Sequence, residues 1–179
     1  GVLTVSYTGD DNGEATITVR AEDNDALNAT TTLDESFTIT VTAVNDEPSF
    51  TKGADQAVLE DSGSSTVAGW ATSISAGPSD ESGQTLTFAV SNNNNSLFSS
   101  QPAVSASGEL TFTPTADANG SATVTLSVSD NGSTGVSGDD DTSPDQTFTI
   151  TVTAVNDPVT LTLAISDYTV LEDAVYTHT

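Results

Sequence analysis

The chain has 179 residues, and its two basic residues, Arg20 and Lys52, face 26 acidic ones, which gives a formal net charge of −24. This charge excludes nucleic acid as a partner, because binding would require Lys and Arg to neutralise phosphates, and an anionic membrane surface would repel the chain. No apolar run approaches the roughly 18 residues of a membrane-spanning helix, so we expect no direct membrane insertion.

An internal repeat sets the order of the predicted elements. Residues 37–46 (FTITVTAVND) recur unchanged at 148–157, and two further stretches return in part, 3–13 at 110–120 and 58–61 at 170–173. Ten consecutive identities do not arise by chance. The chain is therefore predicted to contain the second half of one repeat at 1–46, a complete repeat at 47–157, and the start of a third at 158–179.

The first segment, residues 1–46, supplies strands five to seven of a β-sandwich in this scheme. Its apolar strand positions are Val5, Ile17, Val19, Ile39 and Val41. These side chains would meet water if no further strand covered them. We therefore expect this half-repeat to need a partner for its apolar face.

The complete repeat alternates apolar and polar residues, which predicts short half-buried strands. Seven strands are expected: around Val58, from Val67 to Ile74, from Leu86 to Val90, from about Leu97 to Val104, around Leu110 and Phe112, from Val124 to Val128, and from Phe148 to Val152. Seven strands in about 110 residues predict an all-β, immunoglobulin- or cadherin-like Greek-key sandwich, here without a disulfide and in tandem. Trp70 is expected to be a packing residue in or near the core.

The last segment, residues 158–179, supplies the first strand of a further repeat and the turn Glu172-Asp173 after it. If the chain ends are natural, this tail could dock on the head of another copy by strand addition, and such a contact would propagate a filament. If the chain is a window of a longer array, the same contacts form within one continuous chain. The sequence leaves both possibilities open.

Strand direction predicts where oxygen ligands converge. Loops after strands one, three and five lie at the end where the chain leaves the sandwich, and loops after strands two, four and six lie where it arrives. Candidates at the departing end are Glu60, Asp61, Asp117, Asn119, Asn156 and Asp157. Candidates at the arriving end are Asn45, Asp46, Asp80, Glu81 and Asp130. The partial repeats add Asp10, Asn12, Asp23, Glu172 and Asp173.

These side chains favour calcium (Ca2+) as the bound ion. Calcium takes six to eight oxygens from carboxylates, amides and carbonyls, whereas zinc would require His or Cys. The chain has no Cys and one His, His178. Bound cations would replace a disulfide staple and offset self-repulsion. Two alternatives stay open: the acidity could serve only solubility, as on a halophilic surface, and Asp and Asn favour turns by themselves.

The repeated motifs resemble a known family. Val-Asn-Asp-x-Pro after a Phe-Thr-Ile-Thr-Val strand, Leu-Glu-Asp at 59–61, and the stretches 112–120 and 128–132 are similar to tandem cadherin-like and immunoglobulin-like repeats of large bacterial surface and secreted proteins. The resemblance covers essentially the whole chain and implies tandem β-sandwiches, calcium between domains, and an adhesive or spacer role. The linker 45–48 differs from the longer Asp-x-Asn-Asp-Asn-x-Pro of animal cadherins, so the number of ions per junction stays open.

The sequence predicts a calcium-rigidified rod and not an enzyme. It contains no Gly-rich phosphate loop, no Cys nucleophile, and no carboxylate pair set apart from the turns, so no catalytic constellation stands out. The expected partners are neighbouring repeats, or copies of the chain arranged head to tail, at the cell surface or outside the cell. The alternative is a carbohydrate-binding β-sandwich, whose partners would be surface glycans or other cells.

Overall fold

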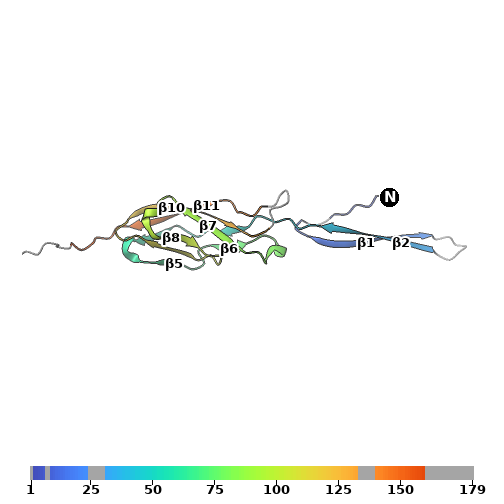
Figure 1. Ribbon diagram of the computed structural model, residues 1–179, viewed down its shortest axis with the longest axis horizontal. Helices are drawn as coiled ribbons and strands as arrows, with labels where there is room; N and C mark the ends of the chain where they lie inside the picture. The colour runs from blue at the N-terminus through green and yellow to red at the C-terminus, as the bar shows by residue number, and fades with distance from the viewer. Residues whose placement is uncertain (1, 7–8, 24–30, 133–139, 160–179) are drawn as a thin grey trace, which may run out of the picture.

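The structure, a computed structural model, describes residues 2–6, 9–23, 31–132 and 140–159. Figure 1 shows an elongated molecule in which a two-stranded hairpin and a larger sandwich follow each other along the long axis. The described residues form strands and short 3₁₀ turns, which confirms the all-β prediction. No helix among them is long and apolar enough to cross a membrane.

The hairpin consists of β1 (Gly13–Asp23) and β2 (Thr31–Val41). The two strands pair antiparallel without a break, from Gly13 opposite Val41 to Asp23 opposite Thr31. Both alternate threonines with apolar residues, a composition that suits a pleated, half-buried surface. In the described residues no third strand joins them, so most of their side chains meet solvent.

The sandwich contains nine short strands in the described residues. They are β3 (Ser49–Thr51), β4 (Gln56–Leu59), β5 (Ser65–Val67), β6 (Thr72–Ser75), β7 (Thr87–Asn92), β8 (Phe98–Val104), β9 (Leu110–Pro114), β10 (Gly120–Ser129) and β11 (Gln146–Thr153). Three 3₁₀ turns lie between them, namely η1 (Glu60–Ser62), η2 (Ser79–Glu81) and η3 (Asn95–Leu97). The main sheet has the order β4-β11-β10-β7, β5-β9-β8 form a second sheet, and β3-β6 form a third.

The core lies between β9 and the pair β10–β11. Alternate residues of these strands point inward, so buried apolar side chains are mostly separated by exposed or half-buried threonines and serines, with the buried Ser127 as an exception in β10. The largest fully buried side chains of these strands are those of Leu110, Phe112, Val124, Leu126, Val128, Ile150 and Val152, each at most 2% exposed. Each such side chain contributes about 1.5–3 kcal/mol relative to an exposed position, so apolar packing holds the sheets together.

One predicted strand is wrong, because Val67 to Ile74 does not form a single strand. β5 ends at Val67 and pairs with β9, whereas β6 pairs with β3 in another sheet. Between them Trp70 turns into the core, where its ring lies 4.3 Å from that of Phe148 and its Nε1 donates to Ala54 O at 2.9 Å. The chain leaves the strand conformation here because it places this large ring in the core. Trp70 is therefore a core residue, as predicted.

Candidate metal sites at the two ends of the sandwich

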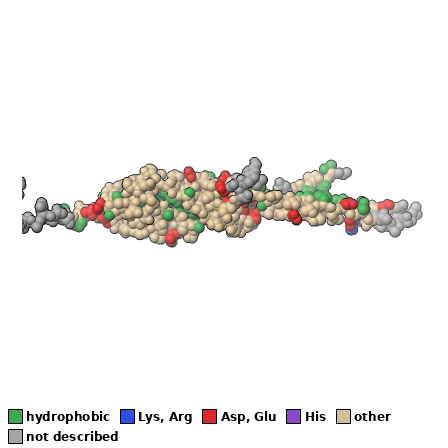
Figure 2. Space-filling model, in the orientation of Figure 1, with side chains coloured by type: hydrophobic (Ala, Val, Ile, Leu, Met, Phe, Trp, Pro, Cys, Tyr) green, Lys and Arg blue, Asp and Glu red, His purple; other side chains and the backbone are tan. Residues whose placement is uncertain are grey.

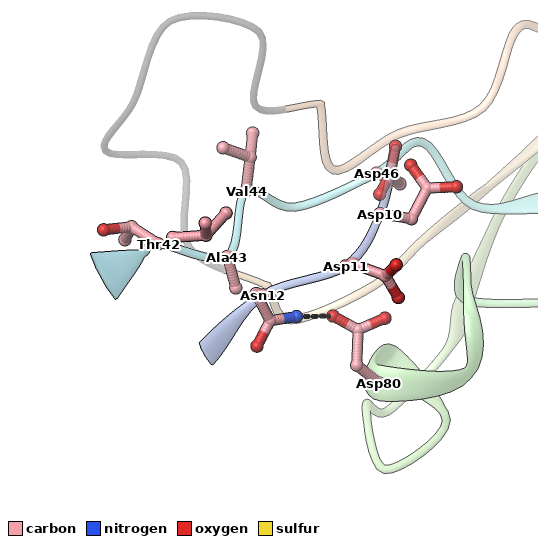
Figure 3. Close-up of a pocket in the computed structure, with 9 residues that line it drawn as sticks. Asp10, Asp11, Asn12, Thr42, Ala43, Val44, Asp46 and Asp80 are labelled. Carbon is pink, nitrogen blue, oxygen red and sulfur yellow. Dashed lines mark hydrogen bonds between the residues drawn. The ribbon is translucent and has the colours of Figure 1, made fainter. Parts of the chain in front are cut away.

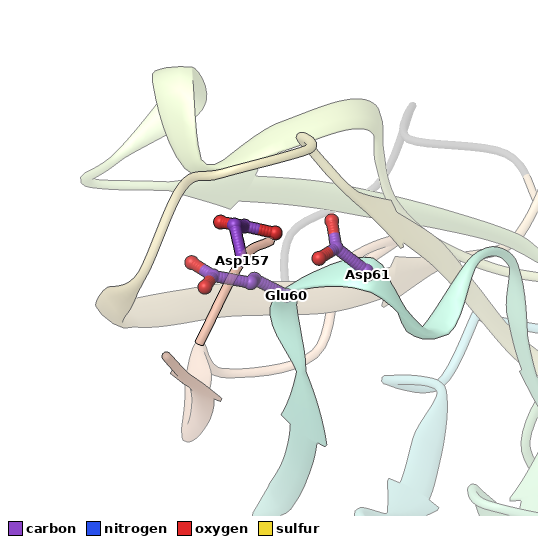
Figure 4. Close-up of side chains that lie close together, drawn as sticks. All are labelled: Glu60, Asp61 and Asp157. Atoms are coloured by element: carbon purple, nitrogen blue, oxygen red, sulfur yellow. The ribbon is translucent and has the colours of Figure 1, made fainter. Parts of the chain in front are cut away.

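Three carboxylates from two distant segments meet where the chain leaves the sandwich. β4 and β11 run parallel, with Leu59 opposite Thr153 as the last pair, so the residues that follow the two strands emerge side by side. Glu60 and Asp61 follow β4 in η1, and Asp157 follows β11. One carboxylate oxygen from each of the three lies within 4.8 Å of the others, and Figure 4 shows the three side chains gathered together.

The turn between β9 and β10 adds two more oxygen-bearing side chains to this group. The C-terminal cluster is therefore Glu60, Asp61, Asp117, Asn119 and Asp157. Asn119 Nδ2 donates to Glu60 Oε2 at 3.1 Å, and the backbone N–H of Val155 donates to Glu60 Oε1 at 2.6 Å. Glu60 is only 3% exposed, so these hydrogen bonds fix its carboxylate at the base of the cluster. The structure thus brings together five of the candidates that strand direction placed at this end.

The turn that carries Asp117 recurs in the first segment with similar backbone geometry. Asp117 has a φ of 58° and Gly120 a φ of 136°. Their counterparts in the repeat, Asp10 and Gly13, have φ values of 64° and 129°. Such positive φ angles suit Asp and Gly and would strain a β-branched residue. The two Asp-x-Asn-Gly motifs therefore fold alike, one in each repeat.

Desolvation and repulsion within the C-terminal cluster both affect the pKa of Asp157. Its pKa is raised above the ordinary Asp value, first by desolvation and then by the negative charges of Asp117, Asp61 and Glu60. A hydrogen bond between the carboxyl groups of Asp157 and Asp117 adds to the rise. A bound cation would relieve this repulsion.

No protein cation balances the cluster within the described part of the chain. Of the two basic residues, Arg20 is engaged in the hairpin, where its Nε lies 2.8 Å from Asp34 Oδ1, and no ion pair joins Lys52 to the cluster. The donor set consists of carboxylate and amide oxygens. Such hard ligands fit calcium, whereas zinc prefers nitrogen and sulfur.

A pocket at the opposite end of the sandwich joins the first segment, the linker and the region of η2 (Figure 3). Its acidic lining comprises Asp10, Asp11, Asp46 and Asp80. Asn12 Nδ2 donates to Asp80 Oδ2, so the first segment and the sandwich are in direct contact here. Asp11 was not among the sequence candidates, because nothing in the repeat pattern distinguished it from its neighbours.

The linker residue Asn45 is buried and ties the linker to the sandwich. Its Nδ2 donates to Asp140 O at 2.8 Å and to the carboxylate of Asp130 at 3.3 Å, and its Oδ1 accepts from Gln84 Nε2 at 2.8 Å. Asp130 also accepts from the backbone N–H of Gly132 at 2.9 Å. Asn45 therefore positions the linker, and whether it also binds a metal stays a prediction.

Glu81, at the end of η2, holds a buried carboxylate beside the linker. It is 6% exposed, and its Oε1 accepts from the backbone N–H of Asp46 at 2.9 Å, whereas its Oε2 has no hydrogen-bond partner in the described residues. Gly77 makes room for this oxygen, since a Cβ there would lie 1.8 Å from Oε2. A buried polar atom without a hydrogen-bond partner is unfavourable, and a cation bound there could satisfy this oxygen. We define the N-terminal cluster as Asp10, Asp11, Asn12, Asp46, Asp80, Glu81 and Asp130.

The remaining candidates lie apart from these clusters or outside the described residues. Asp23 is the last residue of β1, at the far end of the hairpin, and joins neither cluster. Asn156 is exposed next to the C-terminal cluster, where its Nδ2 donates to Asp157 O at 3.3 Å. Glu172 and Asp173 lie outside the described residues.

The aromatic side chains of the sandwich pack inside it. Trp70, Phe98, Phe112 and Phe148 are each at most 4% exposed. Phe50 is also buried and meets the ring of Phe88 edge-on at a centroid distance of 5.0 Å. The described part of the sandwich therefore presents no row of exposed aromatic rings on which sugars could stack.

Comparison with known families identifies the sandwich region. A family model described as a bacterial Ig domain matches residues 45–138, just over half of the chain. The match begins in the linker and covers β3 to β10. No curated protein matches the chain.

Proposed function

The chain belongs to the bacterial Ig domain family, a group typical of surface and secreted proteins and usually non-catalytic, and we propose that it is a calcium-stiffened spacer repeat outside the cell. Calcium bound at the junctions between repeats limits bending and turns a string of sandwiches into a rod. The rod holds adhesive parts of a surface protein away from the cell that carries it.

The C-terminal cluster is the observation that carries this proposal. Three carboxylates from two segments far apart in sequence lie within 4.8 Å of one another. Carboxylates this close together repel one another when they are ionised. A fold that gathers these groups without a basic neighbour in its described residues favours a bound cation.

The two ends of the sandwich supply complementary halves of one junction. The internal repeat relates three residues of one cluster to three of the other: Asp10 to Asp117, Asn12 to Asn119, and Asp46 to Asp157. At the N-terminal end, Asn12 donates a hydrogen bond to Asp80, and the backbone N–H of Asp46 donates one to Glu81. Asp80 and Glu81 both belong to the sandwich. A junction that combines both halves would offer enough oxygens for the six to eight that calcium takes.

Packing of the aromatic residues favours the spacer over the carbohydrate-binding alternative. A sugar-binding face of this kind uses exposed aromatic rings, whereas the aromatic side chains of the sandwich pack in its core. Acidity for solubility alone would also leave the C-terminal cluster unexplained, because it requires charge on the surface and not carboxylates that converge from separate segments.

Isothermal titration calorimetry with calcium chloride tests the proposed function. Asp61→Asn removes one carboxylate from the C-terminal cluster with little change of shape. Glu35→Gln removes one charge from the middle of β2, away from both clusters, and serves as the matched control. We expect the unmodified chain and Glu35→Gln to bind calcium equally well. Asp61→Asn should weaken binding at one site by about tenfold or more, which corresponds to about 1.4 kcal/mol.

Two results would contradict the proposal. One is the absence of any binding heat for calcium with the unmodified chain at ordinary salt. The other is an Asp61→Asn variant that binds calcium as the unmodified chain does.

A further inference from the structure

Three Asn-Gly pairs occur in the chain, at 12–13, 119–120 and 131–132. In such a pair the backbone nitrogen of glycine can attack the side-chain carbonyl carbon of asparagine, because glycine has no Cβ to hinder the approach. The attack closes a five-membered imide and releases ammonia, and hydrolysis of the imide leaves aspartate or isoaspartate. The groups around each pair decide how readily this deamidation occurs.

The pair Asn131–Gly132 has a hydrogen-bond partner on each of its two reacting groups. The backbone N–H of Gly132, the nucleophile, donates to Asp130 Oδ1 at 2.9 Å. The side-chain oxygen of Asn131, on the carbon that is attacked, accepts from the backbone N–H of Thr85 at 2.7 Å. A base beside the nucleophile and an N–H donor on the carbonyl oxygen are the two groups that promote acyl transfer in enzymes.

The fold holds the N–H donor of Thr85 in place before any reaction begins. Thr85 and Asn131 are 46 residues apart in the sequence, so their hydrogen bond is a tertiary contact. β7 pairs antiparallel with β10, and Thr87 lies opposite Ser129. Residues that precede β7 therefore lie beside residues that follow β10. A donor fixed in this way stabilises developing negative charge without the cost of reorientation.

Packing of the linker requires a glycine at position 132. A Cβ there would lie 1.5 Å from Oδ1 of Asn45, the buried residue that ties the linker to the sandwich. A larger residue would displace Asn45, so this contact favours a glycine after Asn131. Asn131 itself is exposed, and water for the hydrolysis step therefore reaches it.

The other two Asn-Gly pairs are held differently. Gly13 and Gly120 are the first residues of β1 and β10, so strand pairing restrains their backbone. Asn12 and Asn119 each donate from Nδ2 to a carboxylate. Within the described part of the chain, no N–H donates to the side-chain oxygen of either asparagine. Folding should therefore slow deamidation at these two positions.

We propose that the chain modifies itself at Asn131, by a deamidation that Asp130 and the backbone N–H of Thr85 promote. Asp130 accepts the proton of Gly132 N as this nitrogen forms a bond to Cγ of Asn131. The N–H of Thr85 stabilises the negative charge that develops on Oδ1. The Cγ–Nδ2 bond then breaks, and Asp130 returns the proton so that ammonia leaves. Water opens the imide to aspartate or isoaspartate.

The modification adds one negative charge beside Asp130, at the N-terminal end of the sandwich. Asp130 accepts a hydrogen bond from Asn45, which positions the linker, so the new charge lies close to this contact. Isoaspartate in addition lengthens the main chain, because the peptide then runs through the side-chain carbons. Each copy gains this charge with time. The inference goes beyond the spacer role and does not depend on calcium.

Peptide mapping by mass spectrometry during incubation at neutral pH tests the proposal with the full chain. Chelator is present throughout, so the outcome is independent of the proposed calcium sites. Deamidation rates at Asn12, Asn119 and Asn131 are measured in the folded chain and in guanidinium chloride, which removes the tertiary contacts. Asn131 should react at least about threefold faster in the folded chain than in denaturant. Asn12 and Asn119 should react more slowly in the folded chain.

The variant Asp130→Asn tests the role of the carboxylate. It keeps a side-chain oxygen that can accept from Gly132 N–H, but this oxygen is not a base. The rate at Asn131 in the folded variant should fall by about threefold or more. Glu35→Gln removes one negative charge from the middle of β2 and should react as the unmodified chain does.

Two results would overturn the proposal. One is an Asn131 that reacts no faster in the folded chain than in guanidinium chloride, a comparison that needs no variant. The other is a folded Asp130→Asn variant in which Asn131 reacts as fast as in the unmodified chain.

Discussion

Glu60 and Glu81 show how differently two buried carboxylates can be held. Both oxygens of Glu60 accept hydrogen bonds, from Asn119 and from the backbone of Val155. Glu81 accepts one from the backbone of Asp46, and its second oxygen is unpaired in the described residues. The carboxylate of Glu60 is therefore satisfied by protein donors alone, whereas the proposed ion would supply the partner that one oxygen of Glu81 lacks in the described residues.

The raised pKa of Asp157 predicts a specific pH dependence in the calcium-free protein. Asp157 binds its proton more tightly in the folded chain than in the unfolded chain. Its contribution to stability is therefore fully present below the unfolded pKa of about 3.9, and it is lost as pH rises through the folded pKa. Calcium competes with this proton, so calcium affinity should fall as pH drops through the folded pKa.

Thermal unfolding in chelator at several pH values, with Asp157→Asn for comparison, measures this effect. At neutral pH the variant should be more stable than the unmodified chain, because one repulsive charge is gone. This difference in stability between the variant and the unmodified chain should become smaller as the pH is lowered. A stability difference that does not change with pH would show that Asp157 has no raised pKa in the folded state.

Most residues of the two clusters could be predicted from the sequence, because strand direction and the internal repeat determine which turns share an end. One cluster residue, Asp11, and one glycine beside a cluster, Gly77, could not. Asp11 lies beside Asp10 in a run of acidic residues, and only the course of the turn sends its side chain into the pocket. Gly77 matters because its missing Cβ leaves space for Glu81, a contact between residues that no periodicity relates.

At the scale of elements, alternation identified the long strands and failed on the short ones. β10 and β11 have 10 and 8 residues, enough for a clear period of two. β3 and β5 have three residues each, too few to show any period, so β3 was missed and β5 was merged with β6. The merging followed from Trp70, whose side chain leaves the alternation to enter the core.

The central strand β10 should carry stability that is independent of the junctions. Leu126 is 1% exposed, so Leu126→Ala should lower the free energy of unfolding by about 2–5 kcal/mol. Thr125→Ala, one position away on the outer face, should cost less than about 1 kcal/mol. Urea unfolding in calcium and in chelator should give the same loss for Leu126→Ala. A loss that changes strongly with calcium would mean that the core and the junctions are not separate sources of stability.

At the scale of the whole molecule, the position of the charge matters more than its amount. Figure 2 shows acidic side chains near both ends of the sandwich and a largely uncharged surface between them on the visible face. The N-terminal cluster lies where the hairpin meets the sandwich, and the C-terminal cluster lies at the opposite end of the sandwich. Screening by monovalent salt acts on all surface charges, whereas the calcium that we propose would act on the clusters at the two ends.

The melting temperature of the full chain in calcium and in chelator, at ordinary monovalent salt, tests the central claim most directly. Ion binding to the folded state alone raises stability through mass action. We expect the melting temperature in chelator to fall by more than about ten degrees, a linkage on the order of a few kcal/mol. Identical melting curves in calcium and in chelator would contradict the calcium-stiffened spacer and would favour acidity that serves solubility alone.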